Sequence, residues 1–193
     1  PCGIIRKKEK REAMDKTAAK RIDKLLEQQV QNGLVKGVSA CILKNGKEIY
    51  SACLGMADEK RGIKWERDTI VRLYSMTKPI TAAAAMILFD RGQLDLQDSV
   101  SWYLPGFRNQ KVMTENGPVP ASKEVKISHL LNMTSGLCYP DDNFPAGREM
   151  SKLYTEFSKE VEKGNPPDTL AYANAIGEQP LAFEPGEKWL YGT

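Results

Sequence analysis

The sequence predicts an α/β fold in which an antiparallel sheet carries the N-terminal helix and a mostly helical region follows. Residues 9–32 repeat apolar side chains at steps of three and four among charges, which is typical of an amphipathic helix. Two β-rich runs, 38–43 and 48–54, are joined by Asn45-Gly46, a dipeptide typical of a tight hairpin. Residues 75–91 are apolar on nearly all sides, which predicts a buried helix.

The remaining segments predict a chain of mainly helices and loops. We expect a strand-like run over 69–74, a surface loop over 105–124, and helices over 127–133 and 151–163. A chain of 193 residues fits one ordinary domain. Within it, we expect residues 1–74 to form the N-terminal helix and sheet hairpin, and residues 75–193 to form the helical region.

Composition excludes several classes of protein. Hydrophobic residues make up 41% and charged residues 27% of the chain, as in globular proteins. Nine basic residues against four acidic ones lie within residues 1–24, so the basic surplus belongs to one segment, and the sequence predicts no nucleic-acid groove. No apolar run is long enough to span a membrane, and residues 1–10 lack the apolar core of a signal peptide.

The cysteines predict neither a metal site nor a disulfide. Their spacing is not the paired spacing of a zinc site (Cys2, Cys41, Cys53, Cys138). With a two-residue turn at Asn45-Gly46, Cys41 would face Tyr50 and Cys53 would face Val38, which places the two thiols on opposite faces of the hairpin. Free thiols favour a reducing, cytoplasmic compartment, and export with a removed signal stays open as the alternative.

Ser75 and Lys78 are the candidate catalytic pair. Their three-residue spacing places both side chains on one helix face, one turn apart. A serine hydroxyl needs a base, and a lysine serves as one when apolar neighbours lower its pKa. The free N–H groups of the helix N-terminus favour developing oxyanion charge. We therefore predict that Ser75 is the nucleophile and Lys78 its proton acceptor, within hydrogen-bond reach.

Other titratable residues offer weaker alternatives. His129 is the single histidine of the chain, which excludes a histidine-rich metal site and disfavours a Ser-His-Asp triad. Asp141 and Asp142 are adjacent in a loop, where a pair of carboxylates is usually solvated. We expect these three residues to have structural or surface roles.

Four segments resemble the class C β-lactamase family, which also includes penicillin-binding proteins, D-aminopeptidases and esterases. The run Ser75-Met76-Thr77-Lys78 resembles the family's first motif. Gly92 to Asp98 resembles the run that follows the nucleophile helix, and Ile127 to Leu137 resembles the segment ending in Thr-Ser-Gly-Leu. Phe183 to Tyr191 resembles the approach to the second motif.

The resemblance implies a β-lactamase/transpeptidase-like fold and assigns further site residues. Tyr191 would relay protons near the nucleophile, and Thr193 would take the substrate-binding third place of the Tyr-x-Asn or Tyr-x-Ser motif. No metal or organic cofactor is implied. The third motif, Lys- or His-Thr-Gly on a later strand, does not occur in these residues. We therefore expect residues 1–193 to be a single incomplete domain, inactive alone, that needs C-terminal strands to complete the site.

These observations predict a serine hydrolase that forms an acyl-enzyme with a small-molecule ester, β-lactam or peptide. Because Thr193 replaces the usual amide-binding residue, a carboxylesterase is favoured slightly over a β-lactamase or D-Ala peptidase. The alternative from another class is an inactive penicillin-binding-protein-like homologue that acts as a binding module. The presence of Ser75, Lys78 and Tyr191 disfavours that alternative.

Overall fold

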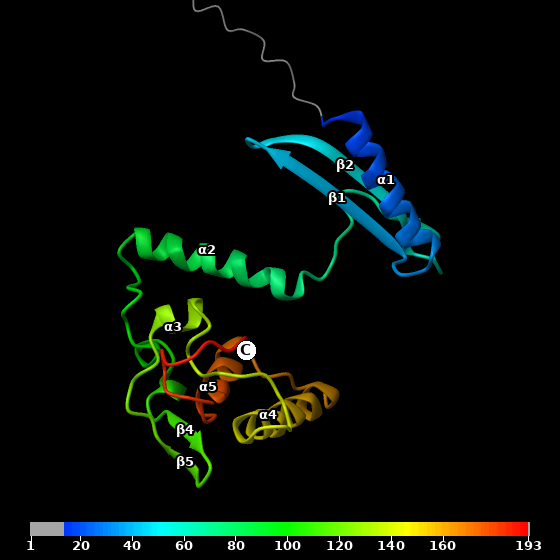
Figure 1. Cartoon of the computed structure of the whole chain (residues 1–193). Helices are drawn as coiled ribbons and strands as arrows, with labels where there is room; N and C mark the ends of the chain where they lie inside the picture. Colours follow the sequence, from blue (N-terminus) through cyan, green and yellow to red (C-terminus); the bar gives the residue numbers. More distant parts are fainter. Residues whose placement is uncertain (1–13, 193) are drawn as a thin grey trace, which may run out of the picture. The chain divides into compact units, whose positions relative to one another are not determined.

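The computed structural model describes residues 14–192 and divides into two compact units (Figure 1). The first unit lies within Pro1–Leu73 and the second within Tyr74–Thr193. That the whole chain forms a single domain stays a prediction. Among the described helices, none combines the length and the apolar character that a membrane crossing requires.

In the first unit, a helix covers one face of a small antiparallel sheet. Helix α1 (Lys16–Gln31) begins at Asp15, whose carboxylate accepts a hydrogen bond from Ala18 N at 3.1 Å. The predicted helix over 9–32 is thus confirmed from Lys16 onward, and residues 9–13 lie outside the described residues. The hydroxyl of Tyr50 donates to Asp23 Oδ1 at 2.8 Å, which ties the sheet to α1.

The hairpin is confirmed, with longer strands than the sequence pattern marks. Strands β1 (Gly37–Lys44) and β2 (Lys47–Asp58) pair antiparallel around Asn45-Gly46. Both turn residues have positive φ, 52° and 71°, as a type I′ turn requires. A short strand, β3 (Ile63–Lys64), pairs with the other edge of β2.

The predicted placement of Cys41 and Cys53 on opposite faces is wrong. Cys41 faces Ser51 and Cys53 faces Ser39, because the register shifts between Ile42 and Leu43. Such a bulge inserts one residue and reverses the alternation beyond it. Both thiols therefore lie on one face, yet both are free, as expected.

The second unit holds the hydrophobic core, formed by helices and a small hairpin. Its elements are α2 (Thr77–Asp90), β4 (Lys111–Thr114), β5 (Gly117–Pro120), α3 (Ile127–Leu131), α4 (Pro145–Glu162) and α5 (Thr169–Gly177). Met150 of α4, Leu181 and Val100 are almost completely buried at its centre. Parallel bridging of Val112 and Leu181 attaches the β4–β5 hairpin to this core.

Two expectations for this unit, and one for the end of the first unit, need correction. The expected loop over 105–124 contains the β4–β5 hairpin, in which the buried side chain of Val112 anchors β4. The polar and proline residues around Val112 are typical of a loop, so the sequence pattern does not indicate this strand. The helix expected from residue 151 begins at Pro145, where proline suits the first turn. The run 69–73 is irregular and forms no strand, since no partner strand pairs with it among the described residues.

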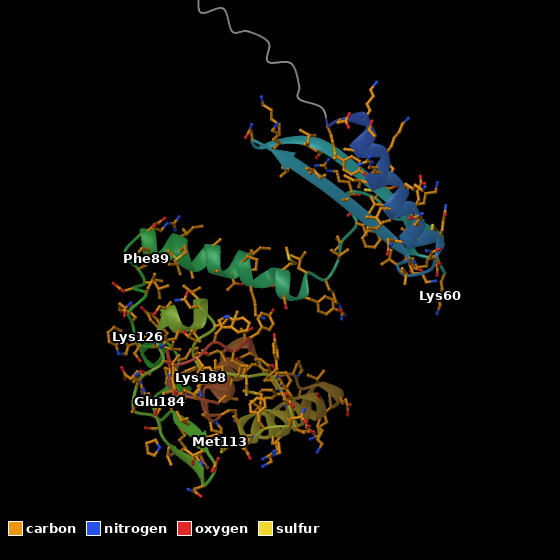
Figure 2. The ribbon with its side chains drawn as sticks, viewed as in Figure 1. Lys60, Phe89, Met113, Lys126, Glu184 and Lys188 are labelled. Carbon is orange, nitrogen blue, oxygen red and sulfur yellow. The ribbon has the colours of Figure 1, made fainter. Side chains whose placement is uncertain are left out.

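Helix α2 forms as expected but is not buried in this structure. None of its residues is buried, and Ile80, Ile87 and Leu88 are 59%, 51% and 43% exposed. Phe89, near its C-terminal end, is also exposed (Figure 2). The described residues of the second unit cover only the side that carries Lys78, Ala82 and Ala85, which lines a cavity.

Two segments far apart in the sequence run side by side next to the core. The amide of Ala182 donates to Gly136 O at 2.7 Å, and the amide of Leu190 donates to Met133 O at 3.0 Å. Gly136 has a φ of +86°, and a Cβ there would lie 2.5 Å from Phe183 O. Only glycine fits this combination of left-handed backbone and close approach.

Gly136→Ala is expected to destabilise the protein by several kcal/mol more than Gly164→Ala. Both glycines have positive φ, but a Cβ at Gly164 meets nothing within 4 Å. The control therefore loses only about 1–2 kcal/mol from left-handed strain, whereas Gly136→Ala also separates the paired segments. Urea unfolding of both variants measures the difference, and equal losses would contradict the close approach.

Candidate active site

Ser75 lies in a 3-10 turn (Tyr74–Met76) that leads directly into α2. Tyr74, immediately before it, has a φ of +47°, a left-handed conformation that costs an L-residue about 1–2 kcal/mol. The turn presents Ser75 exposed at the N-terminal end of α2. The strain is thus stored next to the predicted nucleophile, as is common at functional sites.

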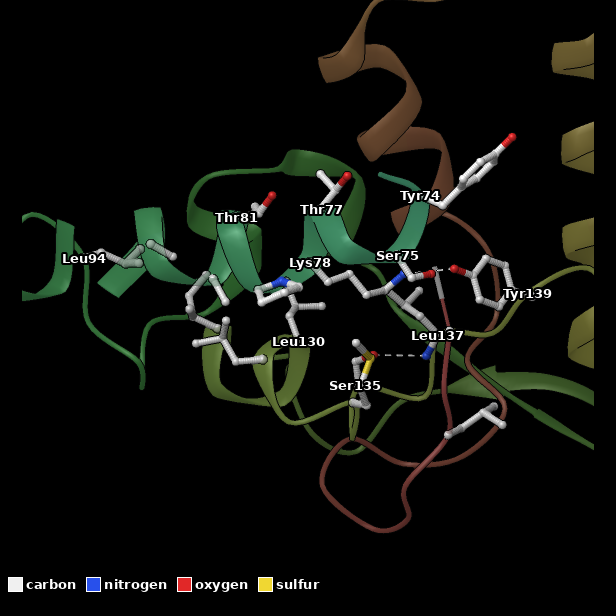
Figure 3. Close-up of a pocket in the computed structure, with 18 residues that line it drawn as sticks. Tyr74, Ser75, Thr77, Lys78, Thr81, Leu94, Leu130, Ser135, Leu137 and Tyr139 are labelled. Atoms are coloured by element: carbon white, nitrogen blue, oxygen red, sulfur yellow. Dashed lines mark hydrogen bonds between the residues drawn. The ribbon is translucent and has the colours of Figure 1, made fainter. Parts of the chain in front are cut away.

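Lys78 is in the first turn of α2, and its side chain extends towards Ser75 and Tyr139 (Figure 3). Its Nζ donates a hydrogen bond to Tyr139 Oη at 3.0 Å. The same nitrogen lies 5.5 Å from the ring centroid of Tyr139 and 4.9 Å from that of Tyr191. At these distances the ring faces attract the cation.

The expected lowering of the Lys78 pKa is wrong. The pKa is raised, because the hydrogen bond with Tyr139 outweighs the opposing desolvation, and Tyr191 adds to the effect. Lys78 is only half-buried, so burial cannot dominate as the apolar sequence around it suggested. Lys78 is therefore a charged ammonium group in the resting site.

Tyr191 shows the opposite shift. A side-chain hydrogen bond with Ser75 lowers the pKa of its phenol, and the hydrogen bond and positive charge of Lys78 lower it further. Both neighbours favour the phenolate form, whose oxygen is a better proton acceptor than that of the neutral phenol is. The structure thus brings together the three predicted residues Ser75, Lys78 and Tyr191, with Tyr191 facing the serine hydroxyl.

Close backbone packing holds Tyr191 in place. Gly192 is buried, and a Cβ there would lie 2.3 Å from Leu137 O. The amide of Leu190 is bonded to Met133 O on the other side of Tyr191. The tyrosine is therefore carried by backbone fixed against residues 133–138.

Tyr139 is a site residue that the sequence analysis missed. It comes two residues after Leu137, in a segment interpreted only as a loop. Its ring centroid lies 5.9 Å from that of Tyr191, with the planes 42° apart. An aromatic residue two positions after the Thr134-Ser135-Gly136-Leu137 segment was the available signal.

A cavity of about 870 Å³ opens beside Ser75 and Lys78. Its walls come mainly from apolar residues of α2, α3 and the segments that follow α3, including Ala82, Leu130 and Leu137. Among the described residues that line it, Lys78 is the only charged one. The cavity therefore suits an uncharged, largely apolar group next to the serine.

Two further predictions concern Thr193 and the absence of a metal site. Thr193, the predicted substrate-binding residue, lies outside the described residues, and its role stays a prediction. Within residues 14–192, no three His, Cys, Asp or Glu side chains gather in a way that would hold a metal ion. His129 instead accepts a hydrogen bond at Nδ1 from the backbone N–H of Lys126 at 3.2 Å, a structural role within α3.

Comparison with known proteins places this chain in a family. The beta-lactamase family model matches residues 22–193, and the chain belongs to that family. The resemblance that the motifs carry and the β-lactamase/transpeptidase-like fold are both confirmed.

Two curated relatives and one solved structure illustrate the family. Protein Rv1367c of Mycobacterium tuberculosis is 32% identical over 82% of this chain and 39% of its own length. Esterase EstB of Burkholderia gladioli is 32% identical over 90% of this chain and 42% of its own. The structure of EstCE1, a hydrolase with promiscuous acyltransferase activity, matches with a TM-score of 0.70 and 28% identity, over 90% of this chain and 43% of its own. The chain spans about two fifths of the length of these relatives.

Removing either partner of Tyr191 is expected to raise the pKa of its phenol. Ser75→Ala removes the hydrogen bond that contributes most, and Lys78→Met removes the nearby cation while keeping the chain length. Titration of ¹³C-labelled tyrosine by NMR would measure both shifts, and the larger one is expected in Ser75→Ala. Tyr103, which bonds to Asp98 outside the site, is the internal reference and should not move. An unchanged Tyr191 pKa in both variants would contradict the geometry.

Proposed function

We propose that this chain carries the nucleophile, proton acceptor and cation of a serine acyl-transfer enzyme. The observation that supports this most directly is the contact series Ser75–Tyr191–Lys78–Tyr139, in which a serine hydroxyl faces a phenol of lowered pKa. The activities named for EstB and EstCE1 support the general class, a hydrolase or acyl-transfer enzyme, without specifying a substrate.

The first step is acylation of Ser75. Its oxygen attacks a carbonyl carbon while its proton passes to the Tyr191 phenolate, and a new C–O bond forms. Lys78 favours the phenolate form of Tyr191 before attack and remains charged throughout. Collapse of the tetrahedral intermediate breaks the bond to the leaving group, which takes the proton from Tyr191. In this sequence of steps Tyr191 accepts the Ser75 proton directly, and Lys78 contributes through its positive charge.

The second step returns the enzyme to its starting state. A water or an alcohol attacks the acyl group on Ser75, and Tyr191 takes the proton of the attacking hydroxyl. The Ser75–acyl bond then breaks and the proton returns to the serine. Water gives a free acid and an alcohol gives a new ester, so one site accommodates hydrolysis and acyl transfer.

The cavity favours esters with an uncharged, apolar acyl part. Its apolar walls stabilise such a group by burial, at roughly 25 cal/mol per Å² of apolar surface. Among the described residues that line the cavity, Lys78 is the one cation that a carboxylate on the substrate would meet, and Lys78 already contacts two tyrosines. A carboxylesterase is therefore the first candidate. A β-lactamase or D-Ala peptidase is the second, in keeping with the name of the matching family model.

A fluorophosphonate probe is expected to label Ser75 in the full-length protein. Ser75→Ala should abolish labelling, because the hydroxyl that Tyr191 activates is gone. Ser158→Ala is a matched control, since that hydroxyl donates to Tyr154 O on α4, outside the cavity. Peptide mass mapping identifies the modified residue. Labelling that survives in Ser75→Ala would place the nucleophile elsewhere.

The same preparation separates the substrate candidates and the inactive alternative. Hydrolysis of p-nitrophenyl esters without acylation by penicillin supports the esterase, and stable penicillin labelling of Ser75 supports the second candidate. No labelling by either reagent in a folded protein would favour the inactive binding module.

We also propose that strands encoded beyond Thr193 cover the exposed apolar side of α2 and complete the site. The uncovered side chains of Ile80, Ile87 and Leu88 are the observation behind this proposal. Exposed apolar patches of this kind on a soluble chain favour aggregation.

The 193-residue segment expressed alone is accordingly expected to be insoluble or molten, and without turnover. Its thermal melt and ester and penicillin turnover are compared with those of the full-length protein. A sharp cooperative melt with turnover comparable to that of the longer chain would contradict the need for further strands.

A further inference from the structure

The ammonium group of Lys78 lies between two tyrosines that belong to different segments. Tyr139 follows the segment after α3, and Tyr191 lies more than fifty residues later. The Lys78 Nζ is 3.0 Å from Tyr139 Oη and 4.9 Å from the ring centroid of Tyr191. Figure 3 shows the lysine side chain extended towards the hydroxyl of Tyr139.

The two phenols have different partners. Tyr191 contacts both the Ser75 hydroxyl and Lys78, whereas the bond that Tyr139 makes in the site is with Lys78. Tyr139 is thus one step further from the serine than Tyr191 is. Any effect of Tyr139 on the reaction therefore passes through Lys78, to which it is hydrogen-bonded.

We propose that Tyr139 is a positioning residue that fixes the Lys78 ammonium beside Tyr191. The proposal rests on the function proposed above, because it assigns Tyr139 a part in activating Ser75. It adds a fourth side chain to the three that the sequence motifs identify.

Lys78 needs such a partner because its side chain is long and only half-buried. A lysine has four rotatable bonds and a strongly hydrated head, so a half-buried one reaches readily into solvent. The hydrogen bond from Nζ to Tyr139 and the two ring faces oppose this motion. The cation then stays where it favours the Tyr191 phenolate.

Tyr139 is suited to this task because its backbone is attached to the core. Leu137 and Cys138, directly before it, are 5% and 1% exposed. The amide of Asp141, two residues later, donates to Gly147 O at 3.2 Å in α4. A phenol carried on this segment offers a fixed acceptor to the mobile end of Lys78.

The proposal has a consequence for the pH dependence of acylation. The titratable groups that act on Lys78 are Tyr139 and Tyr191, and the charge of Tyr139 also acts on Tyr172 of α5. Removing the Tyr139 hydroxyl frees Lys78 and weakens its effect on Tyr191. The pKa of Tyr191 then rises, and the acid limb of the rate profile moves to higher pH.

The test compares Tyr139→Phe with Tyr103→Phe in the full-length protein. Tyr139→Phe keeps the ring against Tyr191 and removes the hydroxyl alone. Tyr103→Phe is the control. It removes the hydrogen bond that the Tyr103 hydroxyl donates to Asp98 at 2.6 Å, and Tyr103 does not line the cavity. Steady-state hydrolysis of a p-nitrophenyl ester is measured from pH 5 to pH 10, with active sites counted by fluorophosphonate.

Tyr139→Phe is expected to lower kcat roughly tenfold with little change in KM, because positioning a catalytic group affects the reaction more than substrate binding. Its acid limb should move to higher pH, while Tyr103→Phe keeps the profile of the parent. Counting active sites removes any effect of partial unfolding on kcat, and the position of the limb does not depend on the amount of folded protein.

If the acid limb of the pH–rate profile stays at the same pH in Tyr139→Phe, with or without a loss of rate, the positioning role is overturned and Tyr139 is a packing residue. That failure is distinct from failure of the proposed function, in which the parent protein itself shows neither turnover nor labelling at Ser75.

Discussion

The candidate site depends on the hydrogen-bonded pairing of residues 133–138 with residues 181–192. Tyr139 is carried at the end of one segment and Tyr191 near the end of the other. Gly136 and Gly192 let the two backbones approach more closely than any side chain would permit. Without this pairing the two phenols would not lie next to Lys78, and Ser75 would not face Tyr191.

The charge of Lys78 changes how the first motif is understood. A lysine one turn after a serine suggests a neutral amine that removes the serine proton. In this structure the lysine has a raised pKa, and the neighbouring phenol has a lowered one. In the proposed mechanism, proton acceptance and positive charge are thus divided between two side chains from different segments, which a motif within one helix cannot reveal.

Much of the local structure could be predicted from the sequence, and the exceptions have physical causes. Asn45-Gly46 specifies the hairpin because both residues tolerate positive φ. The bulge at Ile42 and Leu43 leaves no mark in the alternation of side chains, so the faces of Cys41 and Cys53 were predicted wrongly. Local patterns locate Ser75 and Lys78, but the contact with Tyr139 depends on tertiary packing and has no local signature.

The burial of Cys138 bears on the chemical reactivity of the whole site. The thiol is adjacent to Tyr139 in sequence, is 1% exposed, and has a pKa raised by burial to about 11. Since only a thiolate attacks electrophiles readily, this sulfur is chemically silent at neutral pH. An electrophilic inhibitor that enters the cavity therefore meets the proposed serine nucleophile without competition from the Cys138 thiol. Irreversible inhibitors built on mild acylating groups, rather than on thiol-directed ones, match the chemistry that this site presents.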